Sequence, residues 1–152
     1  MKILKFTPIF KQTLWGGSKI KLLKNLDIQQ ESIGESWELS GVTGNETICT
    51  DGSQLSLNQL VALHKERLVG RHAYEAYGNT FPLLVKFIDA RQDLSIQVHP
   101  DDETARRQNK EYGKTEMWYM MPSDEGAFLY SGLSKEISRE QYKDMVNEGS
   151  IC

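Results

Sequence analysis

Cysteine and histidine are scarce in this sequence, and it contains no long apolar run. Its two cysteines, Cys49 and Cys152, are too few for a disulfide framework and lack Cys-x-x-Cys spacing, which fits a reducing compartment such as the cytoplasm. No apolar stretch approaches the length of a membrane span. The apolar part of Met1–Pro8 is too short for a signal peptide. The sequence therefore predicts a cytoplasmic protein that makes no use of a membrane.

The sequence also shows little clustering of basic residues. The formal net charge is −3, and the lysines are scattered, with one cluster at Lys19, Lys21 and Lys24. A nucleic-acid partner is not expected, because such proteins carry a basic stripe or patch. With 152 residues, 39% hydrophobic and 26% charged, the composition is that of a soluble globular protein. We expect one domain over residues 1–152.

Period-two patterns dominate the chain and predict a mainly β, antiparallel protein with a few helical inserts. Capping boxes at Ser56 to Gln59 and Ser138 to Gln141 predict helices that end at Gly70 and near Gly149. A third helix should begin at Asp101 or Asp102 and run toward Gly113. Strands are predicted at residues 3–6, 36–39, 47–50, 83–88, 94–99, 116–121 and 127–130.

Metal-ligand side chains fall on two of the predicted strands. In residues 94–99, aliphatic side chains alternate with polar ones, so Ser95, Gln97 and His99 share a face. At about 3.3 Å per residue, the backbones of Gln97 and His99 lie roughly 7 Å apart, close enough for both side chains to reach one ion. Glu116 begins the second strand and would supply a carboxylate.

Glu116 lies in an otherwise apolar, aromatic segment, where a carboxylate is costly unless it is paired or binds a metal. An alternative interpretation is structural. Glu116 would then form an ion pair with Lys114 or His99 at the end of a wet edge strand. Residue types alone leave both interpretations open, because Gln is an uncommon zinc ligand.

Four blocks in the same order resemble one family across nearly the whole chain. Residues 94–102 (LSIQVHPDD) and 113–118 (GKTEMW) are similar to the metal-binding strands of type I mannose-6-phosphate isomerases, which are cupin-fold zinc enzymes. Residues 14–17 (LWGG) and 33–40 (IGESWELS) are similar to the family's two earlier glycine-containing aromatic segments.

The resemblance implies one zinc ion per full-length enzyme, held by Gln97, His99 and Glu116 together with a second His far downstream. This sequence has no counterpart of that second His, since its other histidines, His64 and His72, precede the metal segments. It also has no segment matching the family's later catalytic Arg motif. We therefore expect the N-terminal part of a longer enzyme, with an incomplete cupin-like antiparallel β-barrel or jelly roll. Such a chain would be inactive alone and prone to self-association.

The implied reaction interconverts mannose 6-phosphate and fructose 6-phosphate, so the expected partner is a sugar phosphate. Lys114 is the predicted catalytic residue, because a lysine two residues before a metal-bound Glu feels the cation and suits proton transfer or an anion contact. Ser95, Glu35 and Trp15 are predicted to contact the substrate.

Two other protein classes stay open. One is a non-catalytic sugar-binding cupin, which would keep the aromatic pocket and can dispense with the ion. The other is an iron cupin oxygenase, which is disfavoured because the predicted polar face offers one His where a facial triad needs two.

Overall fold

A computed structural model of the chain describes residues 3–27, 29, 32–95, 97–108 and 112–151. The chain divides into two compact units, residues 1–95 and 96–152. The strands and the larger part of the buried core belong to the first unit, and the predicted metal ligands belong to the second.

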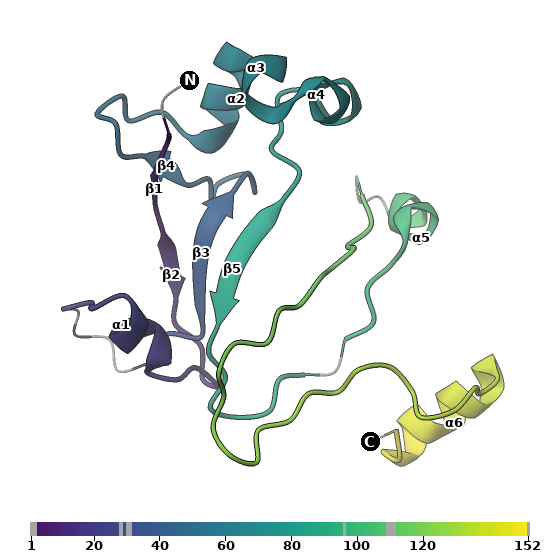
Figure 1. The fold of residues 1–152 in the computed structure, drawn as a ribbon. Coiled ribbons are helices and arrows are strands. Elements are labelled where there is room, and N and C mark those ends of the chain that lie inside the picture. The colour runs from purple at the N-terminus through teal and green to yellow at the C-terminus, as the bar shows by residue number, and fades with distance from the viewer. Residues whose placement is uncertain (1–2, 28, 30–31, 96, 109–111, 152) are drawn as a thin grey trace. The chain divides into compact units, whose positions relative to one another are not determined.

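Two small antiparallel sheets form the framework of the first unit (Figure 1). Strand β1 (Phe6–Thr7) pairs with β4 (Ile48–Cys49). The second sheet has the order β2-β3-β5, with β3 (Glu35–Ser40) between β2 (Ile9–Lys11) and β5 (Leu84–Ile88). The predicted strands at 36–39 and 83–88 are confirmed, whereas those at 3–6 and 47–50 are shorter or displaced.

Four helices of the first unit are α1 (Lys19–Leu23), α2 (Leu57–His64), α3 (Glu66–Val69) and α4 (Arg71–Tyr77). The predicted capping box begins α2, since the Ser56 hydroxyl accepts the Gln59 N–H and the Gln59 side chain accepts the Ser56 N–H. The single helix predicted up to Gly70 is wrong, because Lys65 adopts a φ of 50° and separates α2 from α3.

The core of the first unit is small and draws its buried residues from both helices and strands. Its fully buried side chains include serines on β3, so polar groups share this interior with aliphatic ones. Each buried polar group needs a partner. Ser36 donates to Glu38, and the Ser40 N–H donates to the Thr47 hydroxyl at 3.2 Å. The buried residues of this unit other than glycine, among those that the structure describes, are Ile20, Ile33, Ser36, Ser40, Thr47, Cys49, Leu57, Leu60 and Val61.

Three glycines join the LWGG and IGESWELS blocks. The Ile33 N–H donates to the Gly17 carbonyl at 3.0 Å, and a Cβ added at Gly16 would lie 2.6 Å from the Gly34 nitrogen. A Cβ at Gly17 would lie 2.4 Å from an Asp89 carboxylate oxygen. Backbones this close leave no room for a side chain. These blocks are therefore explained by packing before any chemistry is considered.

The second unit contains α5 (Asp102–Arg107) and α6 (Arg139–Glu148). Both begin at the predicted caps, since the Asp101 carboxylate accepts the Thr104 N–H and the Ser138 hydroxyl accepts the Gln141 N–H. Helix α6 ends at Gly149, whose φ of 69° is left-handed, whereas α5 ends at Arg107, well before Gly113.

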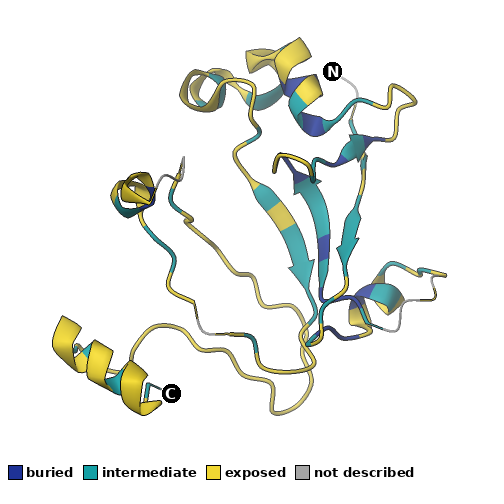
Figure 2. Cartoon of the chain, turned by 180° about the vertical axis from the view of Figure 1, so that it is seen from behind, coloured by how far each residue is buried: buried dark blue, intermediate teal, exposed yellow. Residues whose placement is uncertain are grey.

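The strands predicted at 94–99, 116–121 and 127–130 are wrong for the described residues, which form no strand there. Alternation determines which side chains share a face, but a strand also needs a hydrogen-bonded neighbour. Most of residues 113–136 are exposed instead, as the yellow segments of Figure 2 show.

The predicted antiparallel pairing of strands is confirmed. The chain was predicted to be mainly β, but the described helices include more residues than the described strands, so the strand content is lower than predicted. The sheets have two and three strands, and the described part of the chain contains no closed barrel. Among the described residues, no helix is both long and apolar enough to span a membrane.

Candidate functional site

His99, Lys114 and Glu116 meet in the second unit. The His99 Nε2 atom lies 3.1 Å from Oε2 of Glu116, and the Lys114 ammonium nitrogen lies 3.0 Å from Oε1 of the same carboxylate. Lys114 also lies 3.3 Å from His99 Nε2. The His99 and Glu116 side chains are only 25% and 28% exposed. Two residues predicted as metal ligands and the predicted catalytic lysine thus form one cluster.

The electrostatics of this cluster keep Glu116 ionised. Burial raises the pKa of the Glu116 carboxyl, but hydrogen bonds from Lys114 and Trp118, with electrostatic interactions from Lys114 and His99, outweigh it. The pKa therefore lies below its ordinary value of 4.5. A carboxylate that stays charged is ready to bind a cation. The same contacts are also the ion pairs that the structural interpretation predicted.

The spacing of His99 and Glu116 fits a zinc ion. Two ligand atoms bonded to one tetrahedral zinc at about 2.0–2.2 Å are separated by about 3.3–3.6 Å. The observed separation of 3.1 Å needs only a small adjustment. Among the described residues, no three His, Cys, Asp or Glu side chains gather at one place. Gln97, the further ligand that the resemblance implies, is not among these residue types.

Gln97 and Ser95 are both exposed, on the segment that leads to His99. Gln97 belongs to the second unit, two residues before His99, whereas Ser95 is the last residue of the first unit. Neither lies on a strand, so the shared face expected from strand alternation is not set by a sheet.

Glu35 and Trp15 lie in the first unit. Glu35, on β3, accepts hydrogen bonds from Trp37 Nε1 at 2.6 Å and from the Lys86 ammonium on β5 at 2.8 Å. The Trp15 ring packs beside Gly34, where an added Cβ would lie 2.8 Å from the ring. Glu35 therefore belongs to a half-buried charged cluster, and Trp15 supports the glycine junction.

Lys86 is a member of this charged cluster that sequence reasoning missed. Its side chain is 22% exposed and pairs with Glu35, which is 17% exposed. The sequence feature that could have identified Lys86 is its position inside the apolar stretch Leu84–Ile88, because a charge in such a strand needs a partner. The partner comes from a neighbouring strand and could not be identified without the pairing of β3 with β5.

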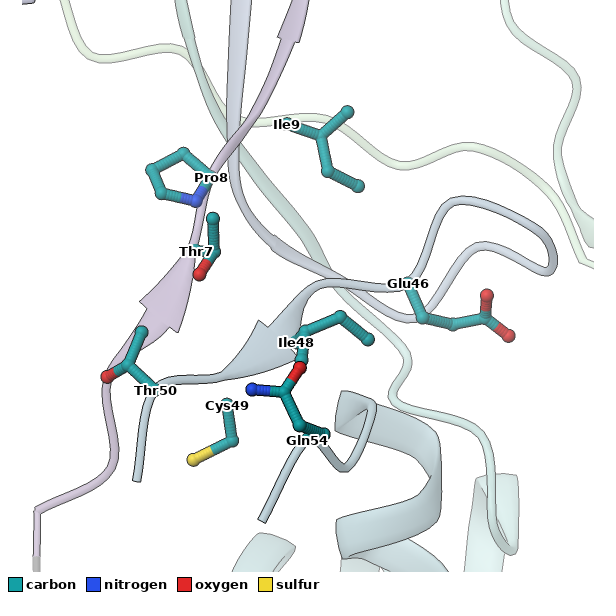
Figure 3. A pocket seen from close by; sticks show the side chains of 8 residues that line it. All are labelled: Thr7, Pro8, Ile9, Glu46, Ile48, Cys49, Thr50 and Gln54. Atoms are coloured by element: carbon teal, nitrogen blue, oxygen red, sulfur yellow. The ribbon is translucent and has the colours of Figure 1, made fainter. Parts of the chain in front are cut away.

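The hollows of the first unit do not coincide with these residues. One of about 500 Å³ lies along β1 and β4, and its polar lining includes Glu46 and Gln54 (Figure 3). Another of about 540 Å³ is lined by apolar side chains, among them Phe6, Leu39 and Phe81. Neither lining includes a predicted site residue.

Comparison with known proteins agrees with the four sequence blocks. The chain is 35% identical over 149 residues to the mannose-6-phosphate isomerase of Streptococcus mutans, a match that covers 93% of this chain and 45% of that protein. The crystal structure of the Bacillus subtilis mannose 6-phosphate isomerase superimposes with a TM-score of 0.74 at 32% identity, over 96% of this chain and 46% of that one.

A third similar protein is a putative mannosephosphate isomerase from Archaeoglobus fulgidus, with a TM-score of 0.61 at 35% identity over 74% of this chain and 38% of that one. The chain thus spans less than half the length of the curated relatives that it matches. Residues 3–129 match the model of the type I phosphomannose isomerase catalytic domain, so this chain belongs to the type I phosphomannose isomerase family.

Proposed function

We propose that this chain supplies the N-terminal part of a zinc-dependent site that interconverts mannose 6-phosphate and fructose 6-phosphate. The observation that carries the proposal is the 3.1 Å contact between His99 Nε2 and Glu116 Oε2, with Lys114 beside both, in a member of this family. His99, Glu116 and Gln97 would hold the zinc ion.

The family match runs across both units, which supports their assignment to one domain over residues 1–152. We propose a cupin-like barrel for this domain, completed by residues of the kind that the longer relatives contain. A cytoplasmic location is proposed with it, where the buried thiol of Cys49 would stay free.

The reaction moves a proton between two adjacent carbons of an open-chain sugar phosphate. Bound zinc would supply the polarisation of the substrate's carbonyl and hydroxyl oxygens. Lys114 would stabilise the negative charge that develops on those oxygens and handle a proton there. Its ammonium group already lies against both proposed ligands, which is where such a charge would form.

The other proposed contacts orient the sugar phosphate. The carboxylate of Glu35 accepts hydrogen bonds, so it would hold a sugar hydroxyl while Lys86 fixes its orientation. The Ser95 hydroxyl would bind a sugar or phosphate oxygen. Trp15 offers an apolar ring face to the sugar, in addition to its packing beside Gly34.

By itself the chain should bind zinc weakly and lack isomerase activity. His99 and Glu116 are two ligands, Gln97 is a weak third, and a missing ligand or support commonly costs about 10–100-fold in metal affinity. The exposed aromatic and methionine side chains that follow Glu116 should also favour self-association.

A chimera provides the decisive experiment. This chain would replace the matching N-terminal part of the Streptococcus mutans isomerase, and bound zinc and turnover of mannose 6-phosphate would be measured. We expect about one zinc per chain and turnover within about tenfold of the parent enzyme, since the ligand types are retained. The variant His99→Ala of the chimera should lose both.

Two outcomes would contradict the proposal. A folded chimera without zinc that still binds sugar phosphate would favour the sugar-binding class. A chimera with zinc that turns over a different sugar phosphate would leave the metal site in place and refute the substrate.

A further inference from the structure

The two segments that carry the proposed ligands are fastened to each other a short distance from the cluster. The Gly113 N–H donates to Oδ1 of Asp102 at 2.8 Å, and the Lys114 N–H donates to the Pro100 carbonyl at 3.0 Å. One hydrogen bond thus uses a side chain and the other uses backbone alone. Together they hold the two segments side by side.

The approach at Gly113 is too close for any other residue. A Cβ at this position would lie 2.6 Å from the Asp101 carbonyl carbon, 2.7 Å from the Asp102 nitrogen and 2.8 Å from the Pro100 oxygen. All three are backbone atoms, which cannot rotate away as a flexible side chain could. The geometry of this contact is therefore specific to glycine.

The two aspartates at the start of α5 have different partners. The Asp101 carboxylate accepts the Thr104 N–H at 2.7 Å and so caps the helix. The cap does not require Asp102, whose carboxylate instead reaches out of the helix to the Gly113 N–H. The side chain of Asp102 is therefore available for a task outside α5.

We infer that Asp102 is a positioning residue, whose carboxylate fixes the spacing of His99 and Glu116 through Gly113. His99 precedes Asp102 by three residues and Glu116 follows Gly113 by three. The Asp102–Gly113 hydrogen bond, here called the clamp, is therefore equally close in sequence to both proposed ligands. Without this hydrogen bond, the two segments would have to be ordered when they bind one ion. The conformational entropy lost in that ordering would weaken metal binding. This inference rests on the proposed function.

Three substitutions in the present chain separate positioning from general stability. Asp102→Ala removes the acceptor and should weaken zinc binding about tenfold, as expected for loss of a group that orients metal ligands. Asp102→Asn keeps an oxygen that accepts the Gly113 N–H and should retain affinity within about threefold, since a neutral acceptor is weaker but present. Asp101→Ala is the matched control, because it removes a neighbouring carboxylate that bonds only within α5.

Zinc affinity would be measured against a chromophoric chelator, and helix content by circular dichroism. Asp101→Ala should lower helix content and leave zinc affinity within about threefold, since the Gly113 contact persists. Equal weakening by both alanine variants would assign Asp102 to helix stability and overturn the inference. If Asp102→Ala unfolds α5, zinc affinity is measured in the variant Asp102→Glu in its place. Because Glu displaces the acceptor by one methylene, an unchanged zinc affinity in that variant would equally overturn the inference.

A readout without metal distinguishes this inference from the proposed function. In the zinc-free chain, nuclear Overhauser contacts between the His99 ring and the Lys114 side chain should disappear in Asp102→Ala and persist in Asp101→Ala. The Gly113 amide should exchange faster in Asp102→Ala alone. Failure of the chimera to bind zinc would refute the proposed metal site, whereas unchanged contacts in Asp102→Ala would refute the positioning role of Asp102.

Discussion

The Lys114 and Glu116 side chains lie against each other, with the Lys114 ammonium nitrogen 3.0 Å from a Glu116 carboxylate oxygen. The Lys114 side chain is 51% exposed, so it also faces solvent, from which a substrate would arrive. A change at Lys114 therefore alters the charge beside a proposed ligand without removing that ligand.

Lys114→Met should separate catalysis from metal binding. In the chimera we expect turnover of mannose 6-phosphate to fall by about 100-fold or more, the usual contribution of a proton-transfer group. Zinc content should stay the same, because no ligand is lost. Lys135→Met, which changes an exposed lysine of the same unit, is the control. A parallel loss of zinc and turnover in Lys114→Met would assign the lysine a structural role.

Glu116 should titrate below 4.5 in the zinc-free chain, because contacts with Lys114 and Trp118 lower its pKa despite partial burial. Since the folded-state pKa is lowered, Glu116 contributes stability above pH 4.5. That contribution is lost as the pH falls through the lowered value. Carbon-detected NMR of the Glu116 carboxyl would measure the midpoint. Lys114→Met should raise it and Lys135→Met should not, and an unchanged midpoint in the former would show that the lysine contact is absent in solution.

The three histidines offer a matched test of the metal site. His99→Ala should weaken zinc binding by about tenfold or more, the expected cost of a lost ligand or its support. His64→Ala and His72→Ala change residues of the first unit and should have no effect on zinc affinity. Competition with a chelator would measure all three. Comparable losses in the three variants would indicate nonspecific binding to imidazole groups.

Gly17→Ala should destabilise the first unit by about 1–3 kcal/mol, the usual range for inserting an atom into a filled site. The new Cβ would lie 2.4 Å from an oxygen of Asp89, whose carboxylate accepts the Ile20 N–H at 3.2 Å. Urea unfolding would give the free energy. The exposed neighbour Ser18, whose side chain makes no capping bond, supplies the control Ser18→Ala.

A double-mutant cycle tests the cause of that destabilisation. In an Asp89→Ala background the carboxylate is gone, so the additional cost of Gly17→Ala should shrink. Additive free energies would show that Gly17 is needed for a reason other than its approach to Asp89.

Self-association should depend on the exposed side chains that follow Glu116. Met117 is 92% exposed and Tyr119 is 85% exposed, and Phe128 is also largely uncovered. Introducing charge by Tyr119→Lys and Phe128→Lys should reduce association in sedimentation velocity experiments, because charge disfavours edge and apolar pairing. Ile3→Lys, at an exposed aliphatic residue of the first unit, is the control. If the lysine variants at 119 and 128 associate as the wild type does, a different surface is responsible.

Local signals predicted the elements whose determinants are close in sequence. The capping boxes at Ser56 and Ser138 and the Asp101 cap each involve residues three apart, and all three helices begin where expected. Helix α1 escaped prediction because its first N–H groups, those of Lys19 and Ile20, donate to Asp89 from far along the chain. A cap supplied by tertiary structure leaves no signature beside the helix.

Part of the candidate site could also be predicted, because the residue types that form it are visible in the local sequence. The residue types of His99, Lys114 and Glu116 indicated a cluster, and the described geometry has them in contact. The expected means of bringing them together, two paired strands, is wrong for the described residues. A hydrogen bond from the Gly113 N–H to the Asp102 carboxylate and the close backbone approach at Gly113 do so instead, and an alternating sequence pattern predicts neither.

The junction of Gly16, Gly17 and Gly34 affects how related sequences should be sorted. These glycines are required because backbone and side-chain atoms leave no space for a Cβ, whatever reaction the protein performs. A homologue that has lost its metal could keep both glycine-containing blocks unchanged and still score as a family member. For the proposed site, the identities at positions 97, 99, 114 and 116 are therefore a better criterion than the glycines for separating isomerases from homologues that share only the scaffold.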